Sequence, residues 1–390
     1  MNAKTFARLT ADLSSDDFAK VEDAANTLCA LRDANAYPLI LEVLECGTPI
    51  VQRVMLWALR NYELSDYAQF MPYVASGDDD VREAAQVLFM EGGDLACKAL
   101  VSSLSSDNIE LQYAAVETLG QMRSECAKKP LVSSLSASAP EVRELAAYSL
   151  SRFEGDDVTD ALLSCLSDDS AVCIAALSGL RGRVLSSDAL LSVMPLLSNA
   201  DALVRASAVY VLDAAVPDSV SCDSDARVRR AAAEVTDSAS ILRELLLDTD
   251  SSVRTAAADA AGKRGMRMDE VLIPMLKDEM PGVRRAAAAA LSNADGDVVI
   301  SALVEALSDP KPGIRAAAAN SLGKIGGEKA KAALVEASRV KNPILAGIIK
   351  NALSELEKRE RGGVVIPLLL RGRLPVRSCL RIRFFLRFCR

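Results

Sequence analysis

The sequence predicts an all-α protein, a right-handed α-solenoid of about twelve two-helix repeats. Three observations lead to this fold class. Aromatic residues make up only 4% of the 390 residues, too few for a β-rich fold, whose strands favour Tyr, Phe and Trp. A nine-residue apolar pattern returns about every 30 residues, and a second apolar segment follows most copies. Units of this kind bury their apolar faces only by stacking on their neighbours.

The repeated pattern is an aliphatic residue, which we call the anchor, followed by Ala at position +4 and Leu at position +8. Ten of the twelve units have the Ala and eight have the Leu. These three positions lie on one face of an α-helix, so each unit contains a helix with one buried stripe, the anchor helix. The anchors are Val21, Val51, Val81, Leu111, Val142, Val172, Val204, Val228, Val253, Val283, Ile314 and Leu345.

Residue chemistry marks where the anchor helices begin. Proline lies two residues before the anchor in five units, where a first turn needs no N–H and benefits from a fixed φ. Asp, Asn or Ser stands just upstream in most units and supplies a helix cap. The five prolines are Pro49, Pro140, Pro281, Pro312 and Pro343.

A second helix of about ten residues is expected between the Leu of one unit and the anchor of the next. The apolar segments that predict it are clearest at residues 100–104, 131–135, 162–166 and 303–307. We expect these second helices to line the concave surface of the solenoid, where a partner would lie.

These units resemble HEAT repeats of the short kind first noted in phycobilisome lyases. The resemblance rests on two-helix units of about 30 residues, with Asp before a Val-Arg pair and then Ala and Leu on one face. It covers about residues 16–360. Because the same solenoid serves scaffolds, transport receptors, pigment lyases and a few enzymes, the resemblance implies the fold and says little about function.

In four consecutive units an Asp stands six residues before an Arg. The resemblance implies that such residues form the Asp/Arg ladder that links successive hairpins. Anion binding by the row of arginines is the functional alternative, but a recurrence in every hairpin favours a structural ladder. The pairs are Asp223 with Arg229, Asp248 with Arg254, Asp278 with Arg284, and Asp309 with Arg315.

The repeat is irregular near residues 204–253, where two anchor spacings shorten to 24 and 25 residues. Only fifteen residues separate Leu212 from Val228, too few for a full second helix and two turns. We therefore expect a degenerate hairpin there, either as simple repeat drift or as a hinge between two arms. The predicted arms are residues 1–215 and 216–361.

The last 29 residues, 362–390, have seven Arg and no acidic residue and do not continue the repeat. This tail is expected to lie outside the solenoid, as a basic membrane-surface segment or, the interpretation we favour slightly, as a non-native extension. Its apolar stretch at 363–370 is much shorter than the roughly 20 residues that cross a bilayer, so no transmembrane segment is expected.

Composition argues against an enzyme. The chain has no His, which removes the usual general base and the His-Glu pairs that hold the di-iron centre of HEAT-repeat hydroxylases. Its nine Cys form no CxxC motif and predict small buried side chains in a reducing compartment, the cytoplasm, and not a zinc site or a disulfide framework. No cofactor is expected.

Charge suggests the kind of partner. Residues 1–220 have 16 Lys and Arg against 32 Asp and Glu, whereas residues 221–361 have 22 against 21. We expect a protein interaction scaffold whose acidic first arm binds a basic protein segment along the second helices of units one to six. The alternative function is a phycobilin lyase-like pigment-attachment factor. Nucleic acid is not expected, because the first arm is acidic and the lone Trp57 fits core packing.

The irregular stretch generates a prediction. A unit without most of its second helix loses contacts on both sides, so limited proteolysis of the native protein should cut first between Asp213 and Arg227. Mass spectrometry of the fragments measures the site. Cleavage confined to the chain termini would show that the short units are fully packed.

Overall fold

The computed structural model describes residues 2–15, 17–339 and 343–363, and these are all-helical, with 23 α-helices and no strand. The chain divides into two compact units, residues 1–220 and 221–390. The boundary at 215/216 stays a prediction from the sequence. The tail from residue 364 onward lies outside the described residues, and residues 362 and 363 end the last helix.

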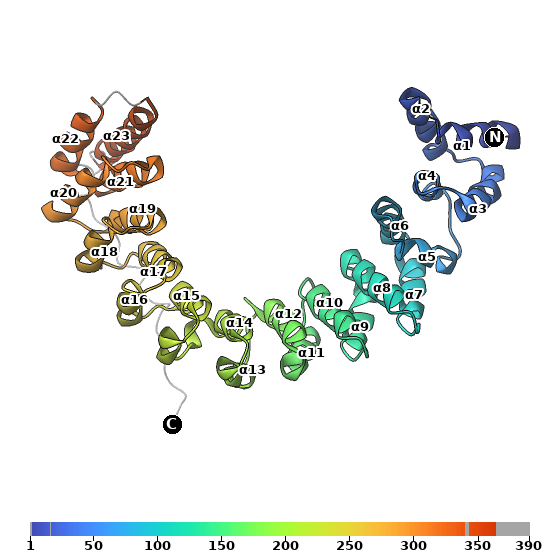
Figure 1. Ribbon diagram of the computed structural model, residues 1–390, viewed down its shortest axis with the longest axis horizontal. Coiled ribbons are helices and arrows are strands. Elements are labelled where there is room, and N and C mark those ends of the chain that lie inside the picture. Colours follow the sequence, from blue (N-terminus) through green and yellow to red (C-terminus); the bar gives the residue numbers. More distant parts are fainter. Residues whose placement is uncertain (1, 16, 340–342, 364–390) are drawn as a thin grey trace, which may run out of the picture. The chain divides into compact units, whose positions relative to one another are not determined.

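The first unit has two layers of helices, one of anchor helices and one of second helices (Figure 1). Consecutive anchor helices pack on one another, and one continuous hydrophobic core runs from Phe6 to Leu212. The anchor helices are α2 (Phe18–Cys29), α4 (Pro49–Leu59), α6 (Asp79–Glu91), α8 (Ile109–Met122), α10 (Pro140–Leu150), α12 (Ser170–Leu180) and α14 (Ala202–Leu212). The other layer comprises α1 (Ala3–Asp12), α3 (Tyr37–Cys46), α5 (Met71–Val74), α7 (Gly93–Ser103), α9 (Glu125–Ser134), α11 (Asp156–Ser164) and α13 (Ser187–Val193).

The second unit repeats this two-layer arrangement. Its anchor helices are α15 (Ala226–Val235), α17 (Ser251–Lys263), α19 (Pro281–Ala290), α21 (Pro312–Ile325) and α23 (Pro343–Gly363). Its second helices are α16 (Ala239–Leu245), α18 (Asp269–Met275), α20 (Asp297–Ala306) and α22 (Gly327–Ala337). Between α14 and α15 the chain forms two short 3-10 helices, η5 (Asp213–Ala215) and η6 (Asp218–Cys222), where other repeats have a second α-helix.

The buried stripe predicted from the repeat is confirmed with four exceptions. The anchors, the Ala at +4 and the Leu at +8 are buried in the core, apart from Val21, Ala25, Leu111 and Leu353, which are half-buried. The prolines begin their helices as expected, and the side chain of Asp78 caps α6 by accepting the Val81 N–H at 3.1 Å. Cys46 and Cys222 are exposed, so the expectation of buried cysteines is wrong for these two.

The expected position of the second helices is wrong. Within each unit taken by itself, the anchor helices lie on the inner side of the curve and the second helices on the outer side (Figure 1). The reason is that the residues where consecutive anchor helices meet are small. A Cβ added to Gly262 would lie 3.0 Å from the Cα of Ala290, and one added to Gly323 would lie 3.0 Å from the Cβ of Ala352. Such small residues let anchor helices approach closely, so their layer is the shorter one.

The core generates a second prediction. Ala287 on α19 is 0% exposed, so Ala287→Glu buries an unpaired charge in a packed layer and should cost about 3–5 kcal/mol of unfolding free energy. Ala289→Glu, at an exposed position of the same helix, is the matched control and should change stability little. Thermal unfolding followed by circular dichroism gives both values. Equal melting temperatures for the two variants would contradict the packing described here.

Candidate interaction surface

The residues of the predicted ladder form a row of bidentate contacts along the second unit. In the first contact, Arg229 donates from Nε and Nη2 to the two carboxylate oxygens of Asp248, at 2.6 and 2.8 Å. The acidic partner therefore belongs to the following repeat. The same contact joins Arg254 to Asp278, at 2.9 and 3.0 Å, and Arg284 to Asp309, at 2.7 and 3.4 Å.

The six-residue spacing between Asp and Arg in the sequence reflects a second contact, made within one repeat. Each ladder Arg also donates from Nη1 to the backbone carbonyl of the Asp six residues earlier. Each Asp in turn accepts the N–H of the residue two positions later, at 2.8 Å, which fixes the turn before the anchor helix. The Arg-to-carbonyl contacts run from Arg229 to Asp223, Arg254 to Asp248, Arg284 to Asp278 and Arg315 to Asp309, at 2.8–2.9 Å.

One ladder contact was missed from the sequence. Arg143 binds both carboxylate oxygens of Asp168 in the first unit, at 2.7 and 2.8 Å. The sequence pattern has an Asp six residues before the Arg, but Ala137 stands six residues before Arg143. The usable signal was an Arg directly after one anchor together with an Asp a few residues before the next.

Partial burial strengthens these contacts. The Asp248 side chain is 8% exposed, and its pKa lies below the usual range mainly because Arg229 donates hydrogen bonds to it. For Asp278, burial raises the pKa, but hydrogen bonds from Arg254 and from the Met280 N–H outweigh burial and leave the pKa lowered. Because Nε, Nη1 and Nη2 of Arg229, Arg254 and Arg284 donate within the protein, the geometry at these three arginines favours the structural ladder over anion binding.

A different surface faces solvent on the inner side of the first unit. We call inner face the residues two and six positions after each anchor in α4 to α14, because these positions point away from the second helices. Four aromatic rings lie in it, and the Tyr148 side chain is 52% exposed. The inner face comprises Arg53, Trp57, Glu83, Val87, Tyr113, Glu117, Glu144, Tyr148, Ile174, Ser178, Ala206 and Tyr210.

Arginines from the same layer stack on three of these rings. The guanidinium carbons of Arg60, Arg152 and Arg181 lie 4.5, 5.5 and 4.2 Å from the ring centroids. Stacking of this kind holds a ring in place at the surface. The rings, in the same order, belong to Trp57, Tyr148 and Tyr210.

The middle of the inner face is acidic. Glu83, Glu117 and Glu144 lie on the consecutive anchor helices α6, α8 and α10. Glu117 accepts a hydrogen bond of 2.7 Å from the buried amide of Gln86. Neither Glu83 nor Glu144 forms an ion pair within the part of the chain that the structure describes. Two exposed carboxylates on the same face as the rings of Tyr113 and Tyr148 form a surface suited to cationic groups.

The described part of the second unit offers no comparable surface, because residues 221–361 contain no Phe, Tyr or Trp. The residues at its corresponding positions are small or polar, or have charges of both signs. They are Arg230, Glu234, Thr255, Asp259, Arg285, Ala289, Ala316 and Asn320.

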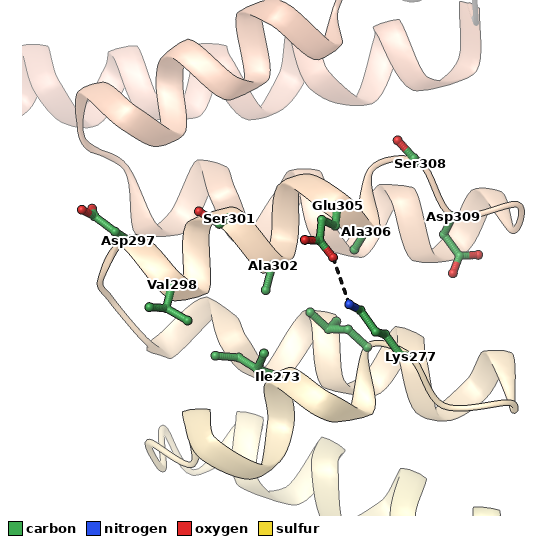
Figure 2. A pocket seen from close by; sticks show the side chains of 11 residues that line it. Ile273, Lys277, Asp297, Val298, Ser301, Ala302, Glu305, Ala306, Ser308 and Asp309 are labelled. Atoms are coloured by element: carbon green, nitrogen blue, oxygen red, sulfur yellow. Dashed lines mark ion pairs between the residues drawn. The ribbon is translucent and has the colours of Figure 1, made fainter.

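The second unit does have a groove of about 550 Å³ on the outer side, between α18 and α20 (Figure 2). Ile273 and Val298 line it, and Val298 is 71% exposed. The ion pair of Lys277 with Glu305, at 3.3 Å, crosses between the two helices. The groove could hold an apolar side chain. No group of three or more potential metal ligands occurs among the described residues.

Comparison with known proteins identifies the repeats. A family model of HEAT repeats matches residues 97–181 and 269–353. The resemblance to the phycobilisome-lyase kind is not confirmed, and the lyase alternative gains no support. No match was found among curated proteins.

Solved structures agree with an α-solenoid. Importin beta matches at 15% identity over 91% of this chain and 56% of that chain, with a TM-score of 0.56. Kap95p, in a structure with RanGDP, matches at 12% identity over 90% of this chain and 60% of that chain, with a TM-score of 0.56. An engineered protein matches at 23% identity over 92% and 99% of the two chains, with a TM-score of 0.38. The chain thus spans under two thirds of importin beta and Kap95p, and the likeness concerns the fold.

No helix among the described residues is both long and apolar enough to cross a membrane.

The ladder generates a third prediction, on pH. The lowered pKa values of Asp248, Asp278 and Asp309 mean that their contribution to stability is present above the unfolded pKa of about 3.9 and is lost as pH falls through the folded values. Asp248→Asn should lower the unfolding free energy by about 1–3 kcal/mol at pH 7 and should flatten its fall between about pH 5 and pH 3.

Urea unfolding at several pH values measures this effect. Asp295→Asn is the matched control, because Asp295 is 75% exposed and pairs with the exposed Arg267. A ladder variant as stable as the control at pH 7 would mean that the ladder does not stabilise the stack.

Proposed function

We propose that this protein is a non-catalytic interaction scaffold that binds an extended, basic segment of another protein along the inner face of its first unit. The observation that carries the proposal is the row of three carboxylates on α6, α8 and α10 together with the exposed rings of Tyr113 and Tyr148 on α8 and α10. The fold is consistent with this function, because Kap95p, which has a similar solenoid fold, binds the protein RanGDP.

The spacing of the helices favours an extended ligand. Packed helices lie about 8–10 Å apart. An extended chain advances about 3.3 Å per residue, so every third residue of the ligand would meet a new anchor helix. A segment of about 15 residues would cross the six helices from α4 to α14.

The chemistry of the inner face favours lysine at those third positions. A lysine stem can pack on a tyrosine ring while its ammonium reaches a glutamate on the same or the next helix. Such contacts are exposed and therefore weak and sensitive to salt. The net charge of −16 in residues 1–220 includes aspartates with other tasks, such as Asp78 and Asp201, which cap helices. We therefore place the partner on the anchor helices.

Carboxylates on this surface would repel the phosphates of a nucleic acid, which supports a protein partner. The lack of catalysis and the cytoplasmic location stay predictions from the sequence.

The proposal is tested with a fluorescein-labelled peptide of 15 residues that has Lys at every third position and Ser or Gly elsewhere. We expect the full-length protein to bind it, with binding weakened severalfold by raising salt from about 50 to 300 mM. Replacing Glu117 and Glu144 together by Gln should weaken binding about tenfold. Fluorescence anisotropy measures both effects.

Two controls accompany this experiment. Asp160→Asn removes an exposed carboxylate from the second helix α11 and should leave binding unchanged. A peptide with Glu in place of Lys should not bind. Equal binding by the double variant and the Asp160 variant, or binding that high salt leaves intact, would overturn the proposal.

A further inference from the structure

A cavity of about 350 Å³ opens at one end of the inner face, between α2, α4 and α6. Its walls include the side chains of Trp57 and Val54 from α4 and of Ala84 from α6. Ala25 and Cys29 of α2 complete the apolar part. The rim is charged and consists of Arg53, Asp80 and Glu83.

Small side chains in the first repeat leave this space. Cys29 occupies position +8 of that repeat, where eight other units have the larger Leu. Burial raises the pKa of the Cys29 thiol, so the thiol stays protonated at neutral pH and acts as an apolar lining. Ala25, at +4, is half-buried, and Ala24 and Leu28 fill the core at this repeat instead. The small side chains at +4 and +8 of this repeat therefore line the cavity.

The indole ring is held from outside the cavity. The guanidinium carbon of Arg60 lies 4.5 Å from the centroid of the Trp57 ring. Arg60 is fixed in turn, because its Nε donates to Oε2 of Glu91 at 2.7 Å. The ring is half-buried, so the expectation that Trp57 serves core packing describes only part of its surroundings.

The charges on the rim are unequal. Arg53 and Asp80 form an ion pair of 2.7 Å and neutralise each other. Glu83 is exposed and forms no ion pair within the described ranges. The cavity therefore combines an apolar wall, an indole ring and one uncompensated carboxylate at its mouth. A long aliphatic stem that ends in a cation satisfies all three.

We propose that this cavity binds one lysine side chain of a basic partner segment, with the stem against Trp57 and Val54 and the ammonium group at Glu83. The inference rests on the proposed function and deepens it, because an occupied cavity fixes where the segment starts on the inner face. A lysine suits the site better than an arginine, since a compact ammonium avoids the guanidinium of Arg53.

Trp57 is the only tryptophan of the chain, so its emission reports on this cavity alone. The full-length protein is titrated with the same 15-residue lysine peptide. Binding is followed in parallel by Trp57 emission and by peptide anisotropy. We expect the emission to shift to shorter wavelength as the stem displaces water from the ring. Glu83→Gln should weaken the affinity obtained from emission about fivefold.

A matched variant and a matched ligand keep the test specific. Glu144→Gln, at the same helical position on α10, should weaken binding while leaving the full emission shift at saturation. A peptide with norleucine in place of lysine keeps the stem, lacks the charge and should give no shift. If anisotropy shows that the peptide binds while Trp57 emission is unchanged, the lysine site in the cavity is wrong and the scaffold proposal still holds. Loss of both signals would overturn both proposals.

Discussion

Close contact between consecutive anchor helices is the constraint on which the rest of the structure depends. Gly323 against Ala352 and Gly262 against Ala290 leave no room for another methyl group. Because this layer is tightly packed, it forms the inner side of each unit, and the outer layer is more open, as the groove between α18 and α20 illustrates. The packing thereby decides which residues meet solvent on the inner face, and so which chemistry is available to a partner.

The sequence allowed most of the fold to be predicted, because position in the repeat determines burial. Ala287 and Leu291 are buried as their positions require. The prediction of which layer is the inner one was wrong. The direction of curvature depends on how closely helices of neighbouring repeats approach. That distance depends on Gly and Ala residues beside the stripe and not on the stripe itself.

The candidate site was less predictable than the fold. The ladder arginines could be found because they recur at a constant place. The pairing of Arg143 with Asp168 was missed because Ala137, and not an Asp, stands six residues before Arg143. Tyr113 and Tyr148 belong to no recurring pattern, because repeat packing does not constrain the exposed positions and each can serve a function separately. Each lies four residues from a glutamate of its own helix, Glu117 or Glu144, and the assembled stack brings the two pairs onto one surface.

The ladder has a consequence for how such a chain can change in length. Arg229 reaches its aspartate after 19 residues, whereas Arg254 and Arg284 reach theirs after 24 and 25 residues, yet the contacts have the same form. The missing residues come from the end of the anchor helix and the loop after it, because α15 has 10 residues and α17 has 13, whereas α16 and α18 both have seven. One edge of the stack therefore keeps a constant register while the opposite edge is free to grow or shrink. Insertions acquired during evolution, or loops grafted by an engineer, would be tolerated on that opposite edge and not beside the arginines.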